Sequence, residues 1–271
     1  MKPAVTIALV PQIRKGPWIY WDDLETSMQK AAALGFPAVE LFTPSPLDAE
    51  RISELCRTYG LQIAAVGTGA GKVLHGLTLT DPDPTARQQA ADFIRDMIHF
   101  GAQLGAPAII GSMQGNVPVD FDRELALDWL AQGLDQLGSY AETQGVPLIY
   151  EPLNRYETGL INRLGDGASF LTSLRSRNVR LLADLFHMNI EETSLPDSIR
   201  EAGALIGHVH YADSHRGPMG TGHTEVPPVV EALQAIGYRG YVSAEAFPWP
   251  SPDAAARQTM ESFRAQFGPF E

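Results

Sequence analysis

The stretch PLIYEPLNRYETGLIN, residues 147–162, decides how the rest of this chain is interpreted. It opens with an apolar run typical of a buried strand, and Glu151 follows where Pro152 removes a ladder hydrogen bond. A carboxylate at the end of a buried strand is costly unless it is paired. Three other apolar runs end with a comparable side chain, at Asp184, His210 and Glu245. Four consecutive strands are therefore predicted to present metal ligands at their C-terminal ends.

Outward from this stretch, the chain alternates strand and helix eight times. Strands are expected at residues 4–10, 38–42, 61–66, 107–111, 147–151, 179–184, 205–210 and 241–245. Helices are expected at about 23–35, 47–60 and 84–104, after residues 122, 166 and 196, and at 252–267. Such alternation requires a parallel sheet with right-handed crossovers. Because a barrel of eight units takes about 250 residues, we expect one (β/α)₈ TIM barrel domain over residues 1–271.

Composition limits the possible partners. The net charge is −12 and the pI is near 5.0, which argues against binding nucleic acid through clustered Lys and Arg. The single cysteine, Cys56, excludes an intramolecular disulfide. The N-terminal run AVTIALV is interpreted as a first strand rather than a signal peptide, and no apolar run approaches the roughly 20 residues of a membrane span. We expect a cytoplasmic protein that binds neither nucleic acid nor membrane.

A long loop, residues 67–84, follows the third strand and contains GTGAGK. Glycines after a strand can free backbone amides for a phosphate group. However, no lysine–serine pair follows, and we expect no helix directly after the glycines. The loop is therefore predicted to be a rim over the active site rather than a phosphate-binding loop.

The four strand-end residues are three carboxylates and one imidazole. This mostly hard ligand set suits Mn²⁺, Mg²⁺ or Co²⁺ better than structural zinc, which prefers cysteine and histidine. His208 shares the strand parity of His210 and should also point into the barrel. Because only His210 lies at the strand end, we assign the metal to His210 and a core role, or one in contact with a ligand, to His208. His215 and His223 are interpreted as loop and rim residues, and His75 and His99 as ordinary histidines.

Several motifs carry a family resemblance. They are EPLNRYE at 151–157, ADLFHMNIEE at 183–192, HVHYADSHRGPMGTGH at 208–223 and SAEAF at 243–247. Together they resemble the xylose-isomerase-like barrels and, among these, the D-tagatose and D-psicose 3-epimerase group of ketose 3-epimerases. The first half of the chain matches mainly as a fold. The resemblance implies a divalent ion, usually Mn²⁺ or Co²⁺, on the four strand-end residues. It also implies that Glu157, His187 and Arg216 hold the O1 and O2 end of the substrate.

The residues themselves agree with this assignment. Glu157 lies six positions after Glu151 across a loop that begins with proline, so its carboxylate can fold back over the site. Two residues expected in a loop separate His187 from Asp184, which lets the imidazole reach a substrate oxygen. Arg216 supplies a positive fork that can polarise a carbonyl or neutralise an enediolate oxygen.

The predicted chemistry is proton abstraction beside a carbonyl. Glu151 and Glu245 could face the two sides of one carbon, so that one removes a proton to leave a cis-enediolate and the other returns it to the opposite face. This predicts an epimerase of a keto-sugar or keto-sugar acid. Return of the proton to the neighbouring carbon would instead give an aldose–ketose or hydroxypyruvate-type isomerase.

Two other classes remain open, an apurinic-site endonuclease of the same superfold and a non-catalytic sugar-binding protein. The substrate is also open. Aromatic residues that could wall the pocket are Trp18, Tyr20, Trp21, Phe247 and Trp249, with Phe247 assigned to the substrate. Arg14, Lys15 and Lys72 could meet a charged group at its far end, and a homo-oligomeric state is left open.

Overall fold

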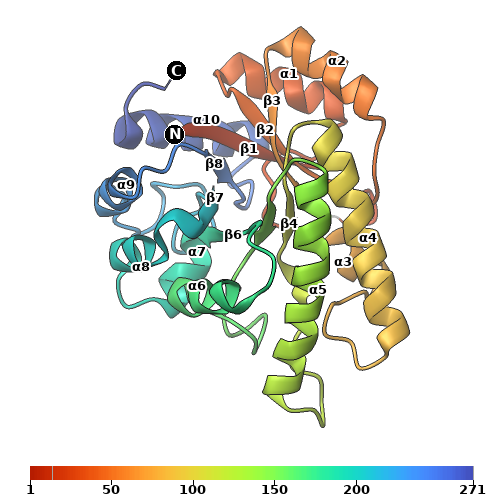
Figure 1. Ribbon diagram of the computed structural model, residues 1–271. Helices are drawn as coiled ribbons and strands as arrows, with labels where there is room; N and C mark the ends of the chain where they lie inside the picture. The colour runs from red at the N-terminus through yellow and green to blue at the C-terminus, as the bar shows by residue number, and fades with distance from the viewer. Residues whose placement is uncertain (14, 271) are drawn as a thin grey trace.

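Eight parallel strands close into a barrel, in chain order, in the computed structural model, which describes residues 1–13 and 15–270 (Figure 1). The strands are β1 (Lys2–Ala8), β2 (Ala38–Phe42), β3 (Gln62–Gly67), β4 (Ala108–Ile110), β5 (Leu148–Tyr150), β6 (Val179–Asp184), β7 (Ile206–His210) and β8 (Tyr241–Ala244). Pairing of β1 with β8 closes the ring, with Lys2 opposite Tyr241. The predicted (β/α)₈ TIM barrel is confirmed.

Helices surround the barrel. They are α1 (Leu24–Leu34), α2 (Ala49–Tyr59), α3 (Ala70–His75), α4 (Pro84–Gln103), α5 (Arg123–Thr143), α6 (Leu164–Ser173), α7 (Leu185–Glu191), α8 (Leu195–Ala202), α9 (Val226–Ala235) and α10 (Pro252–Phe267). Helix ends follow local chemistry: Asp23 accepts a hydrogen bond from the Thr26 amide at the start of α1, and Gly35 ends the helix with φ 87°. The helix predicted after Asp166 instead begins at Leu164.

The barrel interior is built in layers from alternate residues of each strand. Ala65, Ile109, Ile149 and Leu182 form one buried apolar cluster inside the barrel. Because side chains on a strand point the same way at every second residue, the next inward positions on β6 and on the chain leaving β5 are Asp184 and Glu151. The layer that contains Asp184 and Glu151 is therefore adjacent to this buried apolar cluster.

Two loop predictions were wrong. Residues 185 and 186, expected in a loop, begin α7, because Asp184 Oδ1 accepts the amides of Phe186 at 2.8 Å and His187 at 3.1 Å and so caps a helix at the strand end. The rim over residues 67–84 contains the short helix α3, which starts just after Gly69 and ends at Gly76 with φ 70°. Of the glycines that were interpreted as loop residues, Gly69 thus precedes the helix and Gly71 lies inside it.

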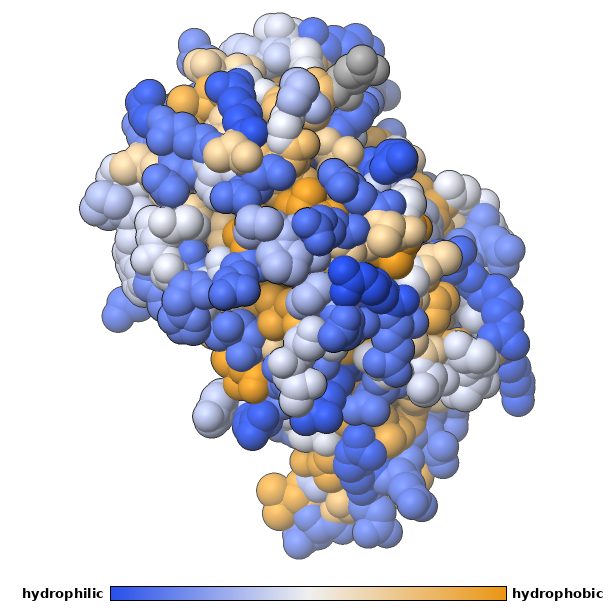
Figure 2. Space-filling model, turned by 90° about the vertical axis from the view of Figure 1, so that its left-hand side faces the viewer, coloured by the Kyte–Doolittle hydropathy of each residue, from blue (hydrophilic) through white to orange (hydrophobic). Residues whose placement is uncertain are grey.

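The surface is mainly polar. Across residues 1–13 and 15–270, no helix has both the length and the apolar character that crossing a membrane requires. Exposed hydrophobic side chains include Val119, Phe121 and Leu125, around the start of α5. Figure 2 shows hydrophobic residues gathered at the lower end of the molecule, where Figure 1 places this end of α5.

Candidate active site

The four predicted metal ligands meet at the C-terminal end of the barrel. Asp184 and His210 are the last residues of β6 and β7, and Glu151 and Glu245 each follow the last residue of β5 and β8. One ligand atom from each of the four side chains lies within 4.8 Å of the others. The structure therefore brings together the four side chains that the strand-end pattern selected.

Glu151 is a buried carboxyl group with unused bonding capacity. It is 5% exposed, and within the described part of the chain its Oε1 has no hydrogen-bond partner. Burial raises the pKa of Glu151 to about 8, with the charges of Glu245 and Asp184 adding to the effect and His210 opposing it. Burial also raises the pKa of Glu245, against the charges of His210 and Arg216. A cation placed among these oxygens would relieve the cost of burying them.

His210 is held between two sets of carboxylates. Its Nδ1 lies 3.3 Å from Asp184 Oδ2 and 3.5 Å from both Glu151 Oε1 and Glu245 Oε2. Its Nε2 lies 3.1 Å from Glu40 Oε1 on β2. Burial would lower the pKa of His210, but the charges of Glu40 and Glu245 outweigh it and raise the pKa well above the usual value. The ring therefore presents Nδ1 to the other three ligands.

Glu40 is the main functional residue that sequence reasoning missed. It is 3% exposed, and its second oxygen lies 2.7 Å from His208 Nε2. The charges and hydrogen bonds of these two histidines overcome its burial and hold the pKa of Glu40 far below its usual range. A carboxylate contacting the far nitrogen of a metal-binding histidine fixes the ring's tautomer and orientation. A signal existed, since Glu40 interrupts the apolar run AVELF, but its partners lie on β7, far along the chain.

These residues fit a divalent cation. Three carboxylates and one imidazole form a mostly oxygen ligand set, one carboxylate oxygen has no partner, and the histidine is oriented by Glu40. Sequence reasoning placed His208 in the core or in contact with a ligand, and the structure places it against Glu40, beside His210.

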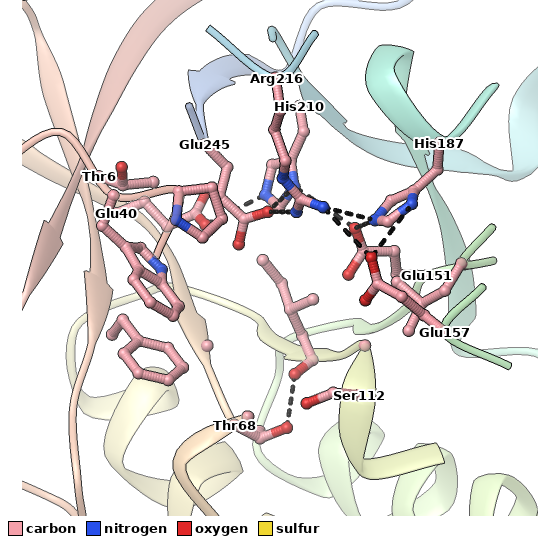
Figure 3. A pocket seen from close by; sticks show the side chains of 18 of the residues that line it. Thr6, Glu40, Thr68, Ser112, Glu151, Glu157, His187, His210, Arg216 and Glu245 are labelled. Carbon is pink, nitrogen blue, oxygen red and sulfur yellow. Dashed lines mark hydrogen bonds and ion pairs between the residues drawn. The ribbon is translucent and has the colours of Figure 1, made fainter. Parts of the chain in front are cut away.

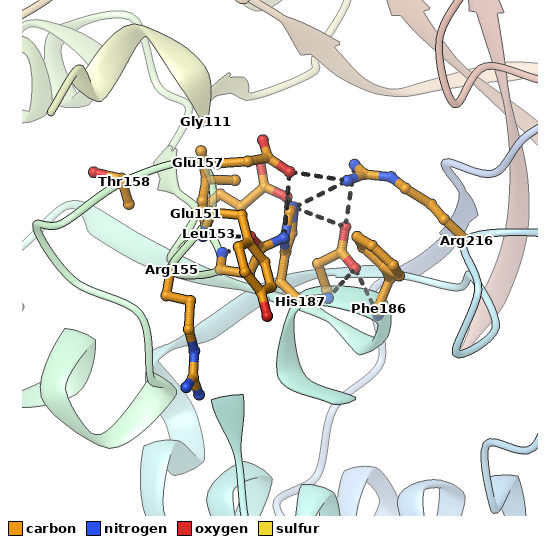
Figure 4. A network of polar contacts seen from close by, with 12 residues as sticks. Gly111, Glu151, Leu153, Arg155, Glu157, Thr158, Phe186, His187 and Arg216 are labelled. Carbon is orange, nitrogen blue, oxygen red and sulfur yellow. Dashed lines mark hydrogen bonds and ion pairs between the residues drawn. The ribbon is translucent and has the colours of Figure 1, made fainter. Parts of the chain in front are cut away.

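Glu157, His187 and Arg216 form a second group beside the four ligands (Figure 4). Arg216 Nη1 lies 3.5 Å from Glu157 Oε1 and 3.3 Å from His187 Nε2, and Arg216 Nη2 lies 2.5 Å from Glu245 Oε2. The triangle that the resemblance implied is therefore present as a set of contacts.

Asn154 fixes the tautomer of His187. The Asn154 backbone amide and side-chain Nδ2 lie 3.2 and 2.7 Å from His187 Nδ1, while Asn154 Oδ1 accepts the Tyr156 amide. Nδ1 is therefore the acceptor, and the proton of the neutral ring lies on Nε2. Burial lowers the pKa of His187, which favours this neutral form. The Nε2–H group and the Arg216 guanidinium thus offer adjacent donors to a bound oxygen.

A cavity of about 260 Å³ opens onto these groups. Figure 3 shows Arg216 and His210 between Glu245 on one side and Glu151 and Glu157 on the other, with Thr68 and Ser112 across the cavity. The volume lies just below the roughly 300–1,000 Å³ of typical small-molecule pockets. The site can therefore enclose a small polar molecule against the acid groups.

The aromatic wall was predicted in part. Trp18 and Phe247 line the cavity, and Trp18 stacks on Phe42 at 4.1 Å between ring centroids. Tyr20 is fully buried in the core, and Trp249 lies behind Phe247, stacked on it at 4.7 Å. The cavity-lining residues that the structure describes include no lysine, so neither Lys15 nor Lys72 reaches it. Arg14 lies outside the described residues.

A parallel barrel with potential metal ligands at the carboxyl ends of its last four strands defines a class of barrel enzymes. A family model described as the xylose isomerase-like TIM barrel matches residues 28–266. D-psicose 3-epimerase of Ruminiclostridium cellulolyticum is 32% identical over 246 residues, which cover 85% of this chain and 82% of that protein.

Two further relatives are similar. The 3-dehydro-D-guloside 4-epimerase of Escherichia coli is 36% identical over 152 residues, covering 54% of this chain and 56% of that protein. A crystal structure of D-psicose 3-epimerase with D-tagatose from Clostridium cellulolyticum superposes with a TM-score of 0.81 at 26% identity, covering 99% of this chain and 100% of that one. The chain belongs to the xylose isomerase-like TIM barrel family, and within it resembles the ketose 3-epimerases. It is an enzyme of the isomerase class.

Proposed function

We propose that this enzyme is a metal-dependent epimerase of an uncharged keto-sugar and inverts the carbon next to the carbonyl, C3 of a 2-ketose. The observation that carries the proposal is the pair Glu151 and Glu245, which follow β5 and β8 and each lie 3.5 Å from the same nitrogen of His210. Figure 3 shows the two carboxyl groups on either side of His210, an arrangement that suits removal of a proton from one face of a carbon and its return to the other.

A divalent ion held by Glu151, Asp184, His210 and Glu245 would polarise the substrate carbonyl and its neighbouring hydroxyl. Mn²⁺ suits the mostly oxygen ligand set, as do Co²⁺ and Mg²⁺. The relatives' names support the epimerase assignment.

The protein groups then have separate roles. One glutamate takes the proton from the substrate carbon, and the electron pair moves onto the carbonyl oxygen to give an enediolate. Arg216 and the Nε2–H group of His187 donate hydrogen bonds to the O1 and O2 end, where negative charge develops. Glu157 accepts a hydrogen bond from a substrate hydroxyl. The opposite glutamate delivers a proton to the other face, which completes the inversion.

The far side of the cavity indicates an uncharged substrate. Among the described lining residues, the positively charged and imidazole groups, Arg216, His187 and His210, all lie on the acid side. The opposite wall presents aromatic rings and small polar groups, including Trp18, Thr68 and Ser112. Aromatic faces cover the C–H faces of a sugar, and hydroxyls bond its hydroxyls. A keto-sugar fits this wall better than a keto-sugar acid.

A second candidate is epimerisation at C4 of a 3-keto-glycoside, which the 36% identity to the Escherichia coli 4-epimerase favours. The same pair of glutamates would act on C4, which follows the carbonyl carbon C3 as C3 follows the carbonyl carbon C2 in a 2-ketose. An aldose–ketose or hydroxypyruvate-type isomerase needs the same groups, with the proton returned to a neighbouring carbon. Cytoplasmic location and a homo-oligomeric state stay predictions.

The test is incubation with ketohexoses, ketopentoses, keto-aldonic acids and 3-keto-glucosides in heavy water with Mn²⁺, read by NMR. We expect a C3 epimer of a ketose that carries deuterium at the inverted carbon. An aldose product with deuterium at C2, together with remaining ketose labelled at C1, would support the isomerase instead. Chelation should abolish turnover and Mn²⁺ or Co²⁺ should restore it, so full activity in metal-free protein would contradict the proposal.

A further inference from the structure

Asp213, three residues after β7, holds together the loop that carries Arg216. Its side chain is 1% exposed and accepts hydrogen bonds from four backbone amides. Oδ1 accepts from Ser214 at 2.7 Å and Thr224 at 3.0 Å, and Oδ2 accepts from Gly220 at 2.8 Å and Gly222 at 2.7 Å. One carboxylate thus joins both ends of the loop between β7 and α9.

The backbone at Arg216 needs such support. Arg216 has φ 61°, in the left-handed region that a residue with a Cβ seldom adopts. A tight turn holds it there, since the Arg216 amide donates to Asp213 O at 2.7 Å and the Asp213 amide donates to Gly217 O at 3.0 Å. Strained residues of this kind persist only where the surroundings determine the conformation.

The turn also joins the loop to the other side of the site. Arg216 O accepts the amide of Phe247 at 2.8 Å, while its guanidinium lies 2.5 Å from Glu245 Oε2. The guanidinium Nε is buried and, among the described residues, has no hydrogen-bond partner, so this donor is available to a ligand. Asp213 is absent from the described cavity lining.

We propose that Asp213 is a positioning residue that sets the substrate-binding geometry of Arg216 by clamping the loop of residues 213–224. The inference rests on the proposed role of Arg216 in holding the substrate. Burial would raise the pKa of Asp213, but the backbone hydrogen bonds outweigh it and lower the pKa to about 2, so the clamp stays charged at neutral pH. Asparagine has the same shape, but its amide would face two of the four N–H donors.

Asp213→Asn and Arg216→Leu, singly and combined, test the inference, with Asp135→Asn as a matched control. Asp135 Oδ1 also accepts two backbone amides, from Arg175 at 2.7 Å and Ser176 at 2.9 Å, but it lies on α5 outside the described cavity lining. We expect Asp213→Asn to lower kcat/KM by roughly thirtyfold or more, since small misplacements of binding groups are costly. Mn²⁺ affinity should change by less than about threefold, and Asp135→Asn should lower kcat/KM by less than about twofold.

The double variant decides between positioning and general stability. If Asp213 acts through Arg216, the double variant should be no slower than Arg216→Leu alone, because the energies of coupled residues do not add. Additive losses, or near wild-type turnover in Asp213→Asn, would overturn the inference. Wild-type turnover in Arg216→Leu would instead overturn the proposed role of Arg216.

A readout without substrate separates the two proposals further. In Asp213→Asn, the amides of residues 214–224 should exchange with solvent faster and the Arg216 Nε–H NMR signal should broaden, whichever sugar is the substrate. An unchanged rate of amide exchange and an unchanged Arg216 signal would refute the proposed positioning role of Asp213. If Asp213→Asn does not fold, Gly222→Ala serves instead, because its Cβ would lie 2.5 Å from Asp213 Oδ1 and 2.6 Å from Ser214 Oγ and would displace the carboxylate.

Discussion

Binding of Mn²⁺ should release about two protons per ion at pH 7, because two ligands are protonated in the metal-free site. With a pKa of about 8, the Glu151 carboxyl is about nine-tenths protonated at pH 7. His210 is protonated as well, because the charge of Glu40 keeps its pKa well above the usual value despite burial. Coordination requires the carboxylate and the neutral imidazole, so both protons must leave.

The magnitude follows from the proton count. Each proton released makes the apparent association constant rise about tenfold per pH unit. Between pH 6 and 7 the Mn²⁺ affinity should therefore rise by about a hundredfold, and the rise should become shallower above pH 8 as Glu151 ionises in the metal-free protein. The Mn²⁺ affinity must rise and not fall with pH, because protons compete with the metal for the same ligand atoms.

Calorimetric titrations in buffers of different ionisation enthalpy measure the protons directly. Glu40→Gln is the informative variant, because it removes the charge that does most to raise the pKa of His210. In this variant the release should fall toward one proton per ion. Release of less than half a proton from the wild-type protein at pH 7, with Mn²⁺ bound, would refute the reasoning.

Three further outcomes are expected. Glu151→Gln and Glu245→Gln, saturated with Mn²⁺, should each lose epimerisation by about 10² to 10⁴-fold while still exchanging deuterium into one epimer; a variant that epimerises near the wild-type rate would contradict the paired roles. Gly111→Ala should weaken Mn²⁺ binding by about tenfold or more, since its Cβ would overlap Glu151 Oε2, whereas unchanged affinity would show that the carboxylate moves freely. Metal-free protein should have a lower Tm at pH 9 than at pH 6, because the stability linked to the raised pKa of Glu151 is lost as pH rises through about 8; a flat or rising profile would contradict this sign.

The strand-end residues were predictable because their signal is local. An apolar run that stops at a carboxylate or histidine can be recognised in one short window, as at Asp184 and Glu245. The last helix was equally clear: Pro252 suits a first turn, Ser251 caps it, and its observed end at Phe267 is the predicted one.

The missed features depend on contacts between distant residues or on double roles. Glu40 becomes functional through histidines 168 and 170 positions away. The start of α7 was hidden because Asp184 ends a strand and caps a helix at once. Asn154 orients His187 across 33 residues, a relation that no spacing rule reveals.

The two halves of the barrel contribute different groups to the cavity. All four proposed metal ligands lie at the ends of β5 to β8, and the His187 and Arg216 donors follow β6 and β7. Most of the opposite wall, including Trp18, Thr68 and Ser112, comes from the segments that follow β1, β3 and β4. A chimaera that joins residues 147–271 to the first four units of a relative with a glutamate in the place of Glu40, which orients His210, should therefore keep the proton chemistry and change the sugar. Within one lineage, recombination near residue 147 could diversify substrates without rebuilding the reaction centre.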